Sequence, residues 1–118
     1  MANPNASTAN TSVAVVRKHT AFSLAADTAE ATTGIIDFRA WSGGMFEVNG
    51  ASTTSITWHV KIDHPSASIE PAFNSAGVAI VQTVADNQVY EIPAALFGAD
   101  FLYPVVNAAG TLYVSLKG

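Results

Sequence analysis

His59, Asp63 and His64 are the side chains whose types and spacing suit metal binding or proton transfer. His59 and Asp63 fall on the same face of an expected strand, and four residues at about 3.3 Å each place them roughly 13 Å apart. Zinc ligands lie about 2 Å from the ion, so this pair cannot form a site by itself. We therefore predict no metal site and expect polar groups that face solvent or an interface, with metal ligation as the alternative.

Two further sets of residues have the types that catalytic sites use. A nucleophile, a base and an orienting group are supplied by Ser23, His19 and Asp27. No G-x-S-x-G turn frames this serine, so a hydrolase triad is not expected. Carboxylates that a glycosidase would need are supplied by Glu47, Glu70 and Glu91. These fall on separate strands or loops, and a short chain barely supplies the cleft between them. We predict no enzyme, no catalytic residues and no cofactor.

Tryptophan and tyrosine side chains are the remaining candidates for binding. Trp58 alternates with apolar residues, which predicts burial in the core. Trp41 either forms an exposed platform on which a sugar ring stacks or lies in the core or an interface, where indoles are common hot-spot residues. The same choice is open for Tyr90, Tyr103 and Tyr113. We predict that Trp41, Tyr103 and Tyr113 contact a partner.

Apolar residues recur at every second position through most of the chain, which predicts the β-strands that must position these side chains. The clearest strand spans residues 56–63, with one buried face that includes Ile62. Other strands are expected at 13–20 (which Phe22 and Leu24 continue or pair with), 35–41, 46–48, 78–84, 89–92, 101–106 and 111–117. The run 78–84 is almost continuously apolar, which is typical of a strand covered on both faces.

Turn and breaker residues separate these strands. Ser42-Gly43-Gly44 is expected to end one strand before the next begins, and it lacks the G-x-x-x-x-G-K spacing of a phosphate loop. Pro104 predicts an edge position or a bulge, because proline cannot donate a ladder hydrogen bond. Residues 93–98 begin with Pro and end with Gly, which predicts one helical turn. The fold class predicted is all-β: an antiparallel β-sandwich or jelly roll of about eight short strands.

The amino-acid composition limits the classes of function that this chain is expected to have. The chain has 118 residues and is 49% hydrophobic, but only 12% are charged, about half the usual ~25% share. A net charge of −4 argues against binding nucleic acid, and no apolar run approaches the ~20 residues that span a bilayer. Outward strand positions carry Thr, Ser, Ala, Val and Tyr more often than Lys or Glu. Charge is depleted at the cores of protein interfaces, so this pattern favours a subunit of an assembly.

The first eleven residues, MANPNASTANT, carry no charged side chain and no periodicity. Such a segment buries too little apolar area to fold by itself. We predict an N-terminal arm at 1–11, followed by a single β-sandwich domain at 12–118. The arm is either disordered or lies along another chain, and in the second case Asn3, Pro4 and Asn5 bind the partner.

Four segments together resemble small structural proteins of tailed bacteriophages, and most of all the capsid cement (decoration) proteins. They are Thr57-Trp58-His59-Val60, Gly77 to Val84, Ile92 to Ala99 and Ala109 to Gly118. The resemblance covers roughly residues 35–118. It implies a β-rich subunit on the outside of a phage head, a homotrimer that clamps neighbouring major capsid proteins, and no catalytic residues.

Two other functions stay open at this point. Phage tail, fibre and neck subunits resemble the same pattern, which would place the chain elsewhere in the virion. A carbohydrate-binding jelly-roll module would use exposed Trp41 or tyrosines on a concave face. The partners predicted are the major capsid protein and further copies of this chain, with no nucleic acid and no membrane.

Overall fold

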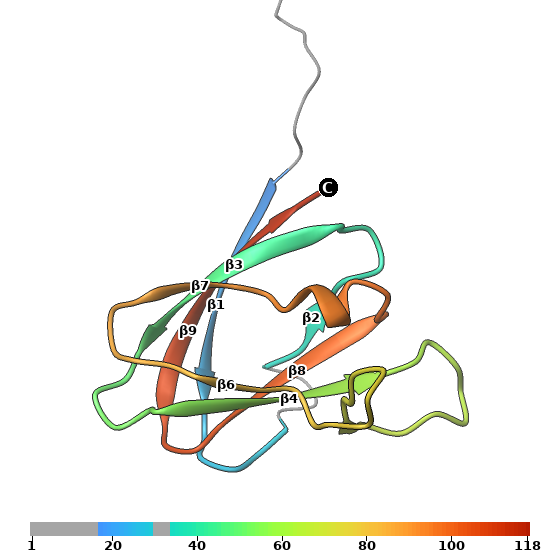
Figure 1. The fold of residues 1–118 in the computed structure, drawn as a ribbon. Helices are drawn as coiled ribbons and strands as arrows, with labels where there is room; N and C mark the ends of the chain where they lie inside the picture. The colour runs from blue at the N-terminus through green and yellow to red at the C-terminus, as the bar shows by residue number, and fades with distance from the viewer. Residues whose placement is uncertain (1–16, 30–33) are drawn as a thin grey trace, which may run out of the picture.

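The regular secondary structure of the fold consists of short β-strands and one 3-10 turn (Figure 1). The computed structural model describes residues 17–29 and 34–118. Within them lie β1 (Arg17–Leu24), β2 (Ile36–Asp37), β3 (Gly43–Asn49), β4 (Ser55–Lys61), β5 (Glu70–Pro71), β6 (Val81–Thr83), β7 (Val89–Glu91), the 3-10 turn η1 (Ala94–Leu96), β8 (Phe101–Val106) and β9 (Gly110–Lys117). In these ranges no helix has the length and apolarity needed to span a membrane.

The strands form two sheets. One has four strands in the order β1-β9-β3-β7. The other has β2-β8-β4-β5, with β6 also paired to β4. The strand pairs are antiparallel, and β1 pairs with β9 along all eight of its residues. The predicted all-β antiparallel fold class is therefore confirmed.

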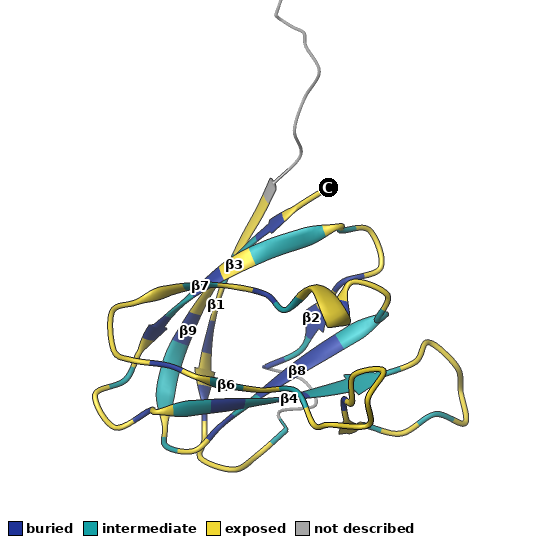
Figure 2. Ribbon diagram, in the orientation of Figure 1, coloured by how far each residue is buried: buried dark blue, intermediate teal, exposed yellow. Residues whose placement is uncertain are grey.

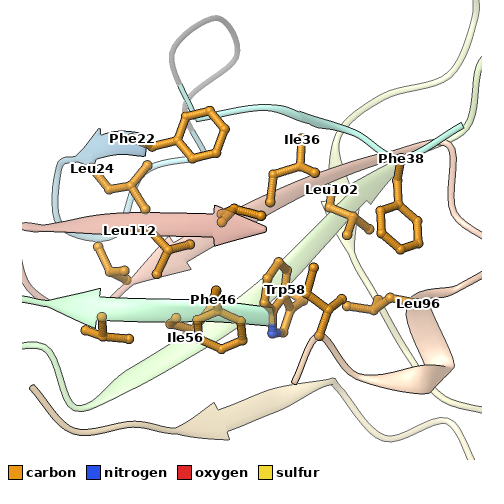
Figure 3. Packing of buried hydrophobic residues seen from close by; sticks show 14 of the residues in the cluster. Phe22, Leu24, Ile36, Phe38, Phe46, Ile56, Trp58, Leu96, Leu102 and Leu112 are labelled. Carbon is orange, nitrogen blue, oxygen red and sulfur yellow. The ribbon is translucent and has the colours of Figure 1, made fainter. Parts of the chain in front are cut away.

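Trp58 of β4 and Phe46 of β3 contact each other across the two sheets. Their ring centroids lie 5.5 Å apart at an interplanar angle of 71°, an edge-to-face arrangement. Tyr90 of β7 lies on the other side of Phe46, with centroids 5.6 Å apart. Figure 3 shows Phe46 and Trp58 among buried apolar side chains of both sheets. Such aromatic pairs add about 0.5–1.5 kcal/mol beyond the burial of their area.

Gln82 of β6 ties the two sheets together along one side of the fold. The indole N–H of Trp58 donates to Gln82 Oε1 at 2.6 Å. The Nε2 of Gln82 donates to the backbone oxygen of Glu91 on β7 at 3.3 Å. Nearby, the N–H of Ala85 donates to the Tyr90 hydroxyl at 2.8 Å. A buried donor left unpaired costs about 1–3 kcal/mol, so Gln82 both satisfies the core indole and joins β6 to β7.

The predicted break at residues 42–44 is wrong, because Gly43 and Gly44 are the first residues of β3 and pair with the end of β9. A Cβ on Gly44 would lie 2.5 Å from the backbone oxygen of Ser115. Real Cβ contacts are not that short, so this position needs glycine for a close approach of two strands, not for a turn.

The prediction of a continuous strand at 78–84, covered on both faces, is also wrong. Only Val81–Thr83 form a strand, and Val78 and Val81 are 59% and 54% exposed. β5 and β6 pair with two successive parts of the same edge of β4. The chain between them leaves the sheet as an exposed hairpin (Figure 2). Ile80 and Val84 pack on the core, but Val78 and Val81 face away from it, so only one face of this run is covered.

Three strand ends also differ from expectation. Ile62 follows the end of β4 and is 69% exposed, so it does not continue the buried face. The strand expected at 35–41 contains only Ile36–Asp37. β1 begins at Arg17, and residues 13–16 lie outside the described part of the chain.

Pro104 lies inside β8, opposite Trp58 of β4. The Trp58 N–H donates to the Ile80 oxygen and the Trp58 oxygen accepts from the Ala72 N–H, so both groups point away from β8. Proline has no backbone N–H, but at this position Trp58 of β4 directs no acceptor toward β8. The missing N–H of Pro104 therefore leaves no group of β4 unpaired. On its other side β2 pairs with Phe101 and Leu102 alone, so the position resembles a sheet edge, as expected for proline.

Trp58→Ala is expected to lower the free energy of unfolding by about 3–5 kcal/mol, because it removes a buried indole that contacts both sheets. Urea unfolding followed by circular dichroism measures the change. Val81→Ala is the matched control, since its side chain is exposed, and it should change stability by less than about 0.5 kcal/mol. Equal effects of the two substitutions would contradict this description of the core.

Candidate protein-binding face

The residues considered for metal binding are held apart by separate contacts. Asp63 accepts from Arg39 NH1 at 3.1 Å, and His64 Nδ1 accepts from the Ser66 N–H at 3.0 Å. His59 lies within β4, and its Nδ1 is buried without a hydrogen-bond partner. The described residues contain no group of three or more His, Asp or Glu side chains placed to hold a metal ion.

The residues considered for a triad also remain separate. His19 and Ser23 lie on the same strand and pair with Ser115 and Thr111 of β9, roughly 13 Å apart along β1. Asp27 lies beyond the strand with a positive φ of 55°, and its N–H donates to the Val106 oxygen at 2.8 Å. This arrangement keeps His19 out of hydrogen-bond reach of Ser23.

Two of the three carboxylates come closer than the sequence indicates. Glu47 of β3 is opposite Val89 of β7, and Glu91 of β7 is opposite Met45 of β3. Glu47 and Glu91 are therefore diagonal neighbours on one face of the sheet, whose Cα atoms lie about 7–8 Å apart in typical geometry. Glu70 belongs to β5 in the other sheet.

Arg39 organises a charged cluster at one end of the five-stranded sheet. Its NH2 group forms an ion pair with Asp37 at 2.7 Å, and its NH1 group pairs with Asp63 at 3.1 Å. The guanidinium lies 4.7 Å from the centroid of the Phe101 ring. Asp100 accepts from the backbone N–H of Asp63 at 2.8 Å. The hydrogen bonds from Arg39 lower the pKa of Asp37, whose usual value is 3.8.

Four of the five aromatic candidates are buried or partly buried. Trp58 is fully buried, as predicted, and Tyr90 packs against the core beside Phe46. Trp41 is half-buried and also packs against the core, which favours the core interpretation over a free stacking platform. Tyr103 is 3% exposed, and this desolvation raises the pKa of its hydroxyl. Such burial does not fit the prediction that Tyr103 contacts a partner, so we leave it out of the candidate surface.

Tyr113 is the predicted partner-binding residue that the structure leaves exposed, at 46%. It lies on the outer face of the four-stranded sheet, whose inner face carries the buried side chains of β9. Asn3, Pro4 and Asn5, the other predicted contacts, lie outside the described residues. The candidate surface is therefore built around Tyr113.

The outer face of the sheet β1-β9-β3-β7 exposes apolar side chains next to Tyr113. Met45 and Val89 are 48% and 56% exposed. One cross-strand row runs Ala21–Tyr113–Glu47–Val89, and the next runs His19–Ser115–Met45–Glu91. These rows line a shallow hollow of about 500 Å³. We call this surface, formed by Ala21, Met45, Val89, Tyr113 and their row neighbours, the outer β-face.

Acidic side chains lie toward one edge of the outer β-face. Glu47 and Glu91 lie toward its β7 edge, whereas His19 lies on β1 at the opposite edge. Tyr113 was predicted from the sequence as a partner contact, but Met45 and Val89 were not. Both are apolar residues at outward positions of strands whose residues alternate between the two faces, and this feature of the sequence could have identified them.

The effect of Arg39 on Asp37 makes stability depend on pH. Because the folded pKa of Asp37 lies below its unfolded value, the pair stabilises the fold above about pH 4, and this contribution is lost as the pH falls through the folded pKa. Asp37→Asn should therefore lower stability at pH 7 by less than about 1 kcal/mol, since the pair is exposed. Unfolding measured at several pH values should show this difference disappear in acid; a difference independent of pH would contradict it.

No protein-family model matches the sequence, and no curated protein matches it. A similar solved structure is that of the SPBc2 prophage-derived protein YomS, with a TM-score of 0.48 and 10% sequence identity. The similarity covers 92% of this chain and 100% of that chain. A likeness of this degree carries no argument about function, which must be argued from this chain's own residues.

Proposed function

We propose that this chain is a structural subunit of a bacteriophage particle, and more specifically a capsid cement (decoration) subunit. In this proposal it binds the outside of the head and stabilises contacts between major capsid proteins. The observation that carries the proposal is the outer β-face, where Met45, Val89 and Tyr113 expose apolar surface on a regular sheet. The resemblance of residues 35–118 to decoration proteins supports the same function.

The low charge of the chain supports a protein partner over a small ligand or a nucleic acid. Charged residues make up 12% of the sequence, and the net charge is −4. Interface cores are enriched in Tyr and Met, and the outer β-face exposes both, with Glu47 and Glu91 toward its β7 edge. Subunits that bind only the assembled head stabilise the assembled state by mass action, which is what a cement protein must do.

The scattered positions of the candidate catalytic residues support a structural role over an enzymatic one. His19 and Ser23 are separated along one strand, and Asp63 is paired with Arg39. The half-buried position of Trp41 gives no support to a sugar-binding platform. We propose three copies per assembly, which repeat one heterologous interface until the ring closes.

The purified chain is expected to have three times its own mass by size-exclusion chromatography with light scattering. An antibody against the chain should label the outside of intact heads in electron microscopy of particles from the phage that encodes it. Label only on tails would assign another position in the virion. Absence of the chain from purified particles, or specific binding to a glycan array, would contradict the proposal.

Tyr113→Ala is expected to weaken association at least about tenfold, a loss of 1.4 kcal/mol, because tyrosine at an interface centre is a common hot spot. Its effect on the free energy of unfolding should stay below about 1 kcal/mol, because the ring is half-exposed. Val81→Ala, an exposed apolar position on the other sheet, is the matched control and should leave association unchanged. Sedimentation analysis of both variants measures association; unfolding by Tyr113→Ala would instead assign the ring to the core.

A further inference from the structure

The two long sides of the sandwich differ in how they are closed. On one side Gln82 links β6 to β7 through its hydrogen bond to Glu91. On the other side, between β1 and β2, a hollow of about 240 Å³ lies between the sheets. Its lining residues are Lys18, Thr20, Phe22, Ile35, Ile36, Asp37, Val114 and Leu116. Most of these are apolar, so the hollow opens directly onto core side chains.

This hollow is flanked by sheet edges. β1 is the outermost strand of its sheet and pairs with β9 alone among the described strands. Its eight residues keep a regular register without a bulge, and Thr20 to Leu24 carry no charge. Natural edge strands are usually protected by charge, proline, bulges or a covering segment. β2 has only two residues, so it covers little of the opening.

The hollow continues toward the start of β1. A second hollow, lined by Lys18, Asp37, Arg39, Ala40 and Trp41, shares Lys18 and Asp37 with the first. Arg17, where the described chain begins, is paired with Lys117 near this end (Figure 1). We call the two hollows together the β1–β2 groove.

We infer that the β1–β2 groove binds the N-terminal segment, residues 1–16, of a second copy of this chain as an added β-strand. The segment has no charged side chain, which suits the part of the groove lined by Phe22, Ile36, Val114 and Leu116. Its residues Val13, Val15 and Val16 have high β-propensity. Fully extended it reaches roughly 50 Å, whereas β1 spans about 26 Å, so it is long enough to reach a neighbour and pair along β1. Strand addition to a free edge is a recurrent mode of peptide binding.

Two observations favour a second copy over the chain's own segment. Residues 13–16 directly precede β1 and contain no Gly, Pro, Asn, Asp or Ser, the residues that most often reverse a chain tightly. A return of the same segment along β1 would need such a reversal. Exchange of arms between copies repeats one heterologous contact, so it is compatible with the closed ring proposed above. This inference rests on that proposed self-association and specifies which residues carry it.

Engineered cysteines test the inference cleanly, because the chain contains none of its own. Full-length Val13→Cys and Thr20→Cys proteins are mixed under mild oxidation and separated by non-reducing electrophoresis. We expect a disulfide-linked pair of chains that joins the introduced thiol at position 13 of one protein to the introduced thiol at position 20 of the other, identified by peptide mass spectrometry. Ser115→Cys is the matched control, half-buried like Thr20 but on the outer β-face, and should form at least tenfold less of the linked pair with Val13→Cys.

The remaining outcomes overturn the inference. The first is that no linked pair forms, and the second is that Val13→Cys links equally well to Ser115→Cys. The third is that a protein carrying both Val13→Cys and Thr20→Cys forms the disulfide only within one chain. A second full-length variant, Val13→Asp with Val15→Asp, should shift the mass from three chains to one, because it places charge against the apolar side chains that line the groove. Ser75→Asp with Ala76→Asp adds the same charge at exposed positions outside the groove and should leave the mass unchanged. Linkage can fail while the chain still labels phage heads, so the two proposals fail independently.

Discussion

The contact between Trp58 and Phe46 is the interaction on which the arrangement of the two sheets depends. It joins β4 and β3, which are consecutive in sequence but belong to different sheets. The indole also requires a hydrogen-bond acceptor, and Gln82 supplies it while reaching across to β7. One buried side chain therefore determines both the packing of the core and the closure of one side, and the opposite side is left more open.

The sequence was most informative where one face is buried and the other is not. β4 and β9 alternate regularly, and both were predicted with nearly correct limits. The alternation of apolar and polar residues gave wrong predictions where contacts with a neighbouring strand, and not the residue type, determine the local structure. Gly44 resembles a turn residue in the sequence, but the proximity of the Ser115 backbone requires it. The apolar residues of 78–84 resemble a strand covered on both faces, but β6 has only three residues and Val78 and Val81 are exposed.

The candidate surface could be predicted only in part, for a related physical reason. Alternation shows which side chains point outward, and Tyr113 was identified in this way. It does not show which outward residues of different strands become neighbours, because that depends on register. Met45 becomes a diagonal neighbour of Tyr113, and Val89 joins the same cross-strand row beyond Glu47, only after β3 is placed between β9 and β7. Tyr103 has the same outward phase along β8, yet its surroundings bury it.

The position of β9 also governs the order in which the molecule can be made. It is synthesised after every other described strand, yet it lies in the middle of its sheet, between β1 and β3. β1 and β3 have no direct pairing with each other, so the earliest strand must wait for nearly the whole chain to be synthesised. Pairing between such distant segments is slow to form. Translation that stops before residue 110 would release a chain that contains every strand of the five-stranded sheet. Its four-stranded sheet would lack β9, the strand that joins β1 to β3.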